Sequence, residues 1–147
     1  MKRNAFFPAL LLVGFFSCNP YKALRHDSFT YTVDGSAQTM QLKVPKGGRK
    51  RVETDSAGNR AQVYSYGNGA RLYFVKLAPG GSYPSADTTD HIGKAQLHGG
   101  LFYKELGADG RYWREVFAHG FRMGYRGATP DQQEARFDSS LNYVRVR

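Results

Sequence analysis

Five cationic side chains fall within nine residues of the chain, with no acidic residue among them: Lys43, Lys46, Arg49, Lys50 and Arg51. They flank residues 45–48, Pro-Lys-Gly-Gly, which favour chain reversal, so we expect the cluster at the tip of a strand–turn–strand unit. Near an anionic surface, each basic residue contributes about 1 kcal/mol of attraction. The alternative is a solvated turn whose charges only prevent edge-to-edge strand pairing. The cluster is a candidate anion-binding site.

A second group of chemically capable side chains lies in residues 78–93, which show no strand pattern. It consists of Asp87, Asp90 and His91. A loop this long in a compact domain is usually functional or disordered. The spacing of the three groups matches no calcium-loop signature, and the alternative is a plain surface loop. They form a candidate ligand loop, to which we assign no metal.

Two histidines are expected on one face of a sheet. A two-residue turn at 109–110 sets Gly100 opposite His119, so that His98 and His119 lie diagonally, roughly 6 to 7 Å apart at Cβ. Zinc needs three or four ligands at bonding distance, and two histidines do not provide them. We therefore predict no metal site here.

Aromatic residues are dense in the second half of the chain: Phe102, Tyr103, Tyr112, Trp113, Phe117, Phe121 and Tyr125. Arginines accompany them: Arg111, Arg114, Arg122 and Arg126. Aromatic faces beside guanidinium groups suit sugars, peptides or acyl chains. The alternative is a small β core surrounded by arginines whose aliphatic stems cover it.

The chain carries little that predicts catalysis. It has no Gly-x-Ser-x-Gly elbow, and its only cysteine is Cys18. A carboxylate pair of the glycosidase kind would not be visible in sequence, because the two residues meet only in the fold. We expect a protein that is not an enzyme and that needs no cofactor.

Short turn signals indicate how the candidate groups are positioned. An Asp-Gly dipeptide at 34–35 separates residues 28–33 from residues 37–44, two runs that alternate apolar and polar side chains. Asp-Gly between such runs favours a two-residue hairpin turn, which sets Phe29 opposite Met40. One face of this hairpin is therefore expected to be buried and the other wet.

Two further hairpins are predicted in the same way. The Asn-Gly dipeptide at 68–69 sets Val63 opposite Phe74 if its turn has two residues. A second Asp-Gly dipeptide, treated alike, sets Lys104 opposite Glu115, an oppositely charged cross-strand pair. This part of the chain is expected to be antiparallel sheet.

The end of the chain has a helical pattern. Residues 129–132, Thr-Pro-Asp-Gln, match a capping box with proline at the first helical position. Phe137 and Leu141 then favour a helix over residues 130–140, and residues 142–146 alternate like a strand. The fold class expected is α+β, mostly β: an antiparallel meander of about seven to eight strands with one short C-terminal helix. Open sheet, sandwich and small barrel all fit the pattern.

The first residues of the chain carry a targeting pattern. A charged Met-Lys-Arg-Asn start precedes an apolar run over residues 5–16, followed by Ser17 and Cys18. As a helix this run rises about 18 Å, whereas a bilayer core is about 30 Å thick. The run therefore has the length of a signal peptide's apolar region, but no Ala-x-Ala-like cleavage site follows it.

This start resembles the signal peptide of bacterial lipoproteins, in which the cysteine becomes the lipidated first residue of the mature protein. That family usually has leucine three residues before the cysteine and small residues after that leucine. Here Ser17 follows the pattern, and Phe15 and Phe16 depart from it. The resemblance implies removal of residues 1–17 and acylation of Cys18, for example with palmitate. The alternative is a plain cleaved signal with an ordinary cysteine nearby.

The resemblance further implies that residues 18–27 are a lipidated tether and that 28–147 are a single β-rich domain. A lone cysteine excludes an internal disulfide. The net charge of +9 suits anionic envelope partners, such as phospholipid or lipopolysaccharide head groups, cell-wall polymers or another envelope protein, and export makes nucleic acid an unexpected partner. No acidic residue directly follows Cys18, which favours an outer-membrane position facing the periplasm.

These observations predict a lipid-anchored protein of the cell envelope that acts as a non-enzymatic binding or structural module. One alternative is a small envelope enzyme acting on cell-wall or glycan material, which would need two facing carboxylates. Another is a carrier of an apolar ligand, which would need the sheet to close into a barrel with an unfilled interior.

Overall fold

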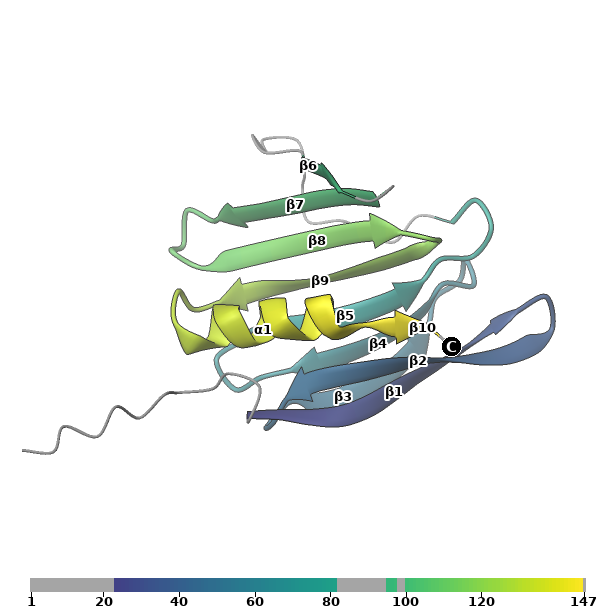
Figure 1. Ribbon diagram of the computed structural model, residues 1–147, viewed down its shortest axis with the longest axis horizontal. Helices are drawn as coiled ribbons and strands as arrows, with labels where there is room; N and C mark the ends of the chain where they lie inside the picture. The colour runs from purple at the N-terminus through teal and green to yellow at the C-terminus, as the bar shows by residue number, and fades with distance from the viewer. Residues whose placement is uncertain (1–22, 82–94, 98–99, 147) are drawn as a thin grey trace, which may run out of the picture.

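The computed structural model describes residues 23–81, 95–97 and 100–146, which form two antiparallel sheets and one helix (Figure 1). The smaller sheet has the order β1-β2-β10 and is built from β1 (Leu24–Val33), β2 (Ser36–Pro45) and β10 (Arg145–Val146). The larger sheet has the order β3-β4-β5-β9-β8-β7-β6. Its strands are β3 (Arg49–Thr54), β4 (Arg60–Ser65), β5 (Arg71–Lys76), β6 (Ala95–Leu97), β7 (Gly100–Leu106), β8 (Tyr112–Ala118) and β9 (Phe121–Ala128).

The predicted fold class is confirmed, because the protein is mostly antiparallel β with one short C-terminal helix, α1 (Gln132–Tyr143). The larger sheet is open, with β3 and β6 at its two ends. The closed barrel on which the carrier alternative depended is therefore not formed. Within the described residues, no helix is long and apolar enough to cross a bilayer.

The core lies between one face of the larger sheet and a layer made of the β1–β2 hairpin and α1, which contacts β2 and β9 (Figure 1). Alternate residues of β1 and β2 point inward, as expected of a half-buried hairpin. The fully buried contributors from both layers include Phe29, Leu42, Val44, Tyr64, Leu72, Phe74, Tyr125 and Phe137. We call the opposite face of the larger sheet, which carries neither α1 nor the hairpin, the outer face.

The β1–β2 hairpin has the predicted register. Asp34 and Gly35 both have positive φ, 48° and 77°, as a two-residue type I′ turn requires. Phe29 is consequently opposite Met40, and both side chains are buried. Leu24–Val33 form β1, so residues 24–27, which were predicted to belong to a tether, lie in a strand.

The next two hairpins are each out of register with the prediction by one residue. Val63 is opposite Tyr73 instead of Phe74, and Lys104 is opposite Arg114 instead of Glu115. In the first hairpin the Tyr66 N–H donates to the Ala70 carbonyl at 2.9 Å, which closes a three-residue loop ending in a glycine with positive φ. The second hairpin closes in the same way. Such a loop adds one residue to the turn, so every cross-strand partner moves by one.

A hairpin turn at His119 and Gly120 joins β8 to β9. Both residues have positive φ, 53° and 75°, and Ala118 is opposite Phe121. His119 is therefore at a turn, so its predicted position opposite Gly100 is wrong. His98, the other member of the predicted pair, lies outside the described residues.

The helix begins slightly later than the capping box suggested. Its N-cap is Asp131, whose carboxylate accepts from the Gln133 N–H at 2.8 Å. Thr129 lies two residues before the cap, and its own N–H donates to the Gln133 side chain at 3.0 Å. Asp131 thus fills the role predicted for Thr129, because an aspartate at the N-cap satisfies a free amide equally well.

Candidate functional site

The five predicted anion-binding cations do not form one cluster. Residues 45–48 join β2 to β3, which belong to different sheets and do not pair, so the expected strand–turn–strand tip is a crossing between sheets. Two of the five cations have partners elsewhere in the fold. Lys43 lies over the Tyr143 ring with Nζ 4.3 Å from its centroid, and Lys50 forms an ion pair of 2.8 Å with Asp27.

The ion pair between Lys50 and Asp27 is well supported by its surroundings. Asp27 is a half-buried carboxylate that also accepts from the Ser28 N–H at 2.8 Å and from the Tyr64 hydroxyl at 2.9 Å. Burial raises the pKa of Asp27, but the hydrogen bonds from Lys50, Ser28 and Tyr64 outweigh it and hold that pKa below its ordinary value. Lys50 therefore joins β3 to β1 through its ion pair with Asp27.

Lys46 and Arg49 remain exposed, and Arg25 joins them from β1. The Lys46 N–H donates to the Ala23 carbonyl at 3.1 Å, and the Arg25 guanidinium donates to the Gly48 carbonyl at 3.4 Å. We call Arg25, Lys46 and Arg49 the basic tip. In the ranges that the structure describes, no acidic residue forms an ion pair with any of the three.

The turn that carries the basic tip is held firmly. The Tyr66 hydroxyl donates to the Pro45 carbonyl at 3.1 Å, and its ring lies so close to Gly48 that a Cβ there would approach it to 2.7 Å. Gly47 has a φ of +85°, which favours glycine. The two glycines that suggested a turn are thus required by the backbone conformation and by Tyr66.

The remaining predicted cation, Arg51, belongs to the outer face. Side chains alternate along β3, so Arg49 and Arg51 project to this face while Lys50 projects toward β1. Strand pairing extends the Arg49 position into a row that crosses four strands: Arg49, Ser65, Arg71 and Arg126. The row contains three arginines, one serine and no carboxylate.

Beside this row the outer face is hollowed. A cavity of about 460 Å³ lies over β3, β4, β5 and β9, with Val63 and Tyr73 among its apolar lining and Arg51, Arg71 and Arg126 among its cations. We call it the arginine hollow. Two carboxylates, Glu53 and Asp55, also line it, but both have partners within the described chain: Glu53 pairs with Arg51 at 3.4 Å, and Asp55 accepts from backbone amides of its own turn.

A buried ionic cluster lies next to the arginine hollow. Glu115 is fully buried, and its Oε1 accepts from the Tyr73 hydroxyl at 2.5 Å and from the buried Arg122. Arg126 reaches the same oxygen at 3.5 Å while its own side chain is 41% exposed. Among the described residues, one carboxylate of this cluster therefore faces two guanidinium groups.

Gly124 makes this cluster possible. It occupies the position between Tyr73 and Glu115 in the cross-strand row, so no side chain separates them. A Cβ at Gly124 would lie 2.7 Å from the Tyr73 hydroxyl and would clash with the Arg114 carbonyl. Only glycine lets the Tyr73 side chain cross β9 to Glu115.

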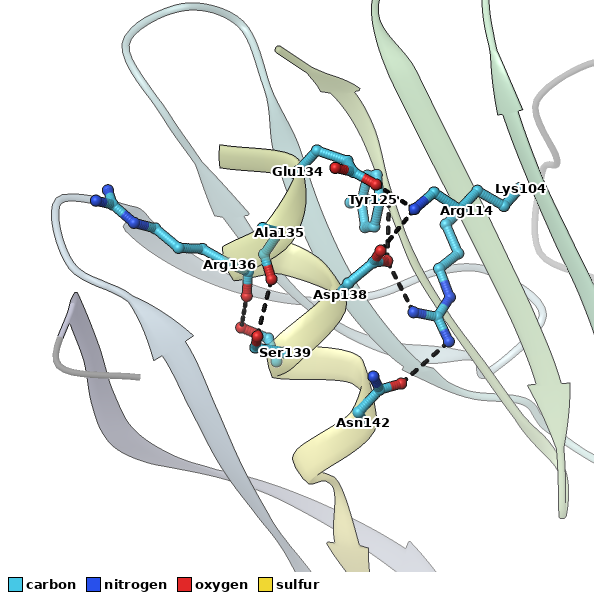
Figure 2. A network of polar contacts seen from close by, with 10 residues as sticks. Lys104, Arg114, Tyr125, Glu134, Ala135, Arg136, Asp138, Ser139 and Asn142 are labelled. Atoms are coloured by element: carbon cyan, nitrogen blue, oxygen red, sulfur yellow. Dashed lines mark hydrogen bonds and ion pairs between the residues drawn. The ribbon is translucent and has the colours of Figure 1, made fainter. Parts of the chain in front are cut away.

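The opposite face of the sheet holds a different polar network, which fastens α1 to β7, β8 and β9 (Figure 2). Asp138 accepts from Lys104 at 2.6 Å, from Arg114 at 2.7 Å and from the Tyr125 hydroxyl at 3.0 Å, while Glu134 pairs with Lys104. Two cations thus meet two carboxylates. Because the charges balance, this network has a structural role and offers no excess charge to a ligand.

Several predicted site residues lie outside the described residues, namely Cys18, Asp87, Asp90 and His91. Among the residues that are described, no group of three or more His, Cys, Asp or Glu side chains is arranged to hold a metal ion.

Sequence reasoning missed Arg71, and it named Arg126 only as one of the arginines that accompany the aromatic residues. The two arginines meet because β5 pairs with β9, and no turn joins these two strands. Side chains alternate between the two faces of a strand, and this rule alone could have placed Lys50 on the opposite face of β3 from Arg49 and Arg51. Comparison of the chain with protein-family models, curated proteins and solved structures finds no match.

Proposed function

We propose that the protein is a lipid-anchored, non-enzymatic binding module of the bacterial cell envelope. In this proposal the basic tip rests on anionic head groups of the membrane that holds the anchor. One observation carries it: the backbone of the basic tip is hydrogen-bonded, through Lys46, to Ala23. Ala23 is the fifth residue after Cys18, the proposed lipidation site.

The length of that connection limits how far the basic tip can lie from the anchor. Five residues span at most about 18 Å even when fully extended. The Debye length at physiological ionic strength is about 8 Å. An anchored chain would therefore keep Ala23, to which the basic tip is hydrogen-bonded, within slightly more than two Debye lengths of the head groups.

The expected strength of this contact supports an auxiliary role. Three basic residues near an anionic surface contribute about 3 kcal/mol in total. A single acyl chain binds a membrane only marginally, and a second basic signal makes the attachment stable. The basic tip would thus hold the domain in one orientation on its membrane. In this proposal the membrane is the outer membrane and the domain faces the periplasm, because no acidic residue directly follows Cys18.

Binding is favoured over catalysis by the state of the carboxylates at the arginine hollow. A glycosidase-like enzyme needs two carboxyl groups facing each other across a substrate. Glu53 is paired with Arg51, and Asp55 is turned toward its own backbone. Glu115 is buried beneath Tyr73 and Arg122.

The test is flotation of the full chain with vesicles. A Cys18→Ser background removes acylation, and the difference between phosphatidylcholine vesicles and vesicles containing phosphatidylglycerol isolates the electrostatic part of binding. Lys46→Gln with Arg49→Gln should abolish most of that difference, and 1 M salt should do the same. Arg145→Gln, an exposed cation on β10, serves as the matched control. Equal binding to both kinds of vesicle by the parent chain would disprove the proposed membrane contact.

Lys50 is excluded from the test variants. Its replacement would break the ion pair with Asp27. A lower stability could then be mistaken for weaker binding.

A further inference from the structure

We propose that β3 pairs with the β3 of a second copy of this chain, antiparallel and centred on Val52, to form a two-fold symmetric dimer. The inference goes beyond the membrane contact of the basic tip and does not depend on it. Three features of β3 support it: the free edge of the strand, the order of its charges and the exposure of Val52.

The first feature is the free edge of β3, which lies at one end of the larger sheet and pairs with β4 on its other side. The Asp55 N–H donates to the Asn59 carbonyl at 3.0 Å, so these two residues form a hydrogen-bonded pair. Such pairs recur at every second residue of an antiparallel ladder. The N–H and C=O groups of Lys50, Val52 and Thr54 therefore point away from β4, where they offer a template for another strand.

The neighbouring edge of β1 is covered, in contrast to that of β3. The Ser28 carbonyl accepts from the Gln62 side chain at 3.1 Å, and the Thr30 carbonyl accepts from the Arg60 guanidinium at 2.8 Å. Within the ranges that the structure describes, no side chain donates in this way to the backbone of Val52. The fold thus blocks one of these two edges with side chains and leaves the other open.

The second feature is the order of the charges along β3. The residues from Arg49 onward are Arg-Lys-Arg-Val-Glu-Thr-Asp, so basic side chains precede Val52 and acidic side chains follow it. In an antiparallel pair centred on Val52, Arg51 is opposite Glu53 of the second copy, and Arg49 is opposite Asp55 of the second copy. Two-fold symmetry repeats both pairs. Opposite charges at facing positions stabilise a pair of strands.

Both carboxylates can take part while they keep their present contacts. Glu53 pairs with Arg51 of its own strand at 3.4 Å, and Asp55 accepts from the N–H groups of Ala57 and Asn59. An ionised carboxylate has about four sites at which it can accept hydrogen bonds. The Arg51 side chain is 79% exposed, so it can also reach a carboxylate on a neighbouring strand.

The charge order also selects the register. If the two-fold axis passes through Arg51, two arginines face each other across it, and if it passes through Glu53, two glutamates do. An axis at Lys50 sets two lysines opposite each other, and an axis at Thr54 sets two acidic residues opposite each other. Like charges at facing positions destabilise a sheet. Among these positions, Val52 alone avoids them.

The third feature is the exposure of Val52. Its side chain is 42% exposed, which is unusual for a large apolar residue among those described. On the two-fold axis it would lie opposite the valine of the second copy and pack against it. The two valines would form a hydrogen-bonded pair, flanked on each side by Lys50 facing Thr54. Because the pairing uses the free edge of both copies, the assembly closes at two chains.

The first experiment exchanges charges at the facing positions and measures dimerisation by sedimentation velocity. It uses the full chain with Cys18→Ser, which removes acylation, in excess nonionic detergent. Arg51→Glu and Glu53→Arg each set like charges opposite each other, so each should weaken dimerisation about tenfold or more. An equimolar mixture of these two variants should dimerise as the parent does, because each strand then faces its charge complement. Arg145→Glu, at an exposed position on β10, is the matched control and should leave dimerisation unchanged.

The second experiment tests the register with single cysteines in the same Cys18→Ser background. Facing residues of a hydrogen-bonded pair have Cα atoms about 5.5 Å apart, which suits a disulfide. Val52→Cys should therefore give a disulfide-linked dimer when oxidised with copper phenanthroline in air. Thr54→Cys is the control, because the two copies of this residue would lie about 13 Å apart along the strands. It should not cross-link.

The proposal is overturned if the parent chain sediments as a monomer at every concentration tested. It is also overturned if the mixture of Arg51→Glu and Glu53→Arg dimerises no better than either variant alone, or if both cysteines cross-link equally. Lys46→Gln lies outside β3, so it should reduce vesicle binding and leave dimerisation unchanged. Failure of the dimer can therefore be told from failure of the membrane contact.

Discussion

Replacing Glu115 with glutamine should destabilise the protein strongly, because it removes the carboxylate that pairs with the buried Arg122 and with Arg126. Glu115 is 0% exposed and Arg122 is 1% exposed. Removing one partner of a buried ion pair typically costs about 3–5 kcal/mol, since the other charge stays buried without compensation. Arg126 is partly exposed and can turn to solvent, so most of the penalty falls on Arg122. We therefore expect about 3 kcal/mol.

The measurement is the free energy of unfolding of the full chain from urea denaturation, with the melting temperature as a second readout. A loss of about 3 kcal/mol is a large part of the 5–15 kcal/mol typical of a domain. It should lower the melting temperature by on the order of 10 °C. The double variant Glu115→Gln with Arg122→Gln should recover part of the loss, because it leaves no buried charge unpaired.

Glu53→Gln is the matched control for this experiment. Glu53 also pairs with an arginine, Arg51, but the Arg51 side chain is 79% exposed. Exposed ion pairs contribute less than about 1 kcal/mol. If Glu115→Gln were as mild as Glu53→Gln, the cluster would not be desolvated in solution.

Three further outcomes follow from the structure. Phe137→Ala should cost about 3–5 kcal/mol in urea denaturation, because the ring is fully buried between α1 and the sheet; a neutral result would mean that α1 does not dock. Burial raises the pKa of Asp138, but Lys104 and Arg114 outweigh it and leave that pKa lowered, so this carboxylate stabilises the fold at neutral pH and ceases to do so as the pH falls below about 4. Asp138→Asn should reduce this acid sensitivity of the unfolding free energy, and an unchanged pH profile would contradict the network. Cys18→Ser should abolish incorporation of labelled fatty acid, and equal labelling of both chains would refute the lipid anchor.

Local patterns were sufficient for the fold class and for the first hairpin, and they were insufficient for the other registers. Asp-Gly at 34–35 forms a two-residue turn, whereas the Asn-Gly at 68–69 is the end of a three-residue loop. The dipeptides look alike, and the difference lies in whether the preceding residue joins the turn. Gly67 does so, which shifts Val63 to face Tyr73. Loop length is decided by how the strands pack, and the dipeptide does not encode it.

Local sequence patterns were also insufficient for the candidate site, because its residues come from segments that are distant in the sequence. Lys43, Lys46, Arg49, Lys50 and Arg51 are close in sequence, yet the fold sends them to different environments. The two arginines that meet on the outer face come from β5 and β9, which no turn connects. Their pairing depends on the whole sheet order, and contacts between distant segments leave no local signal in one sequence.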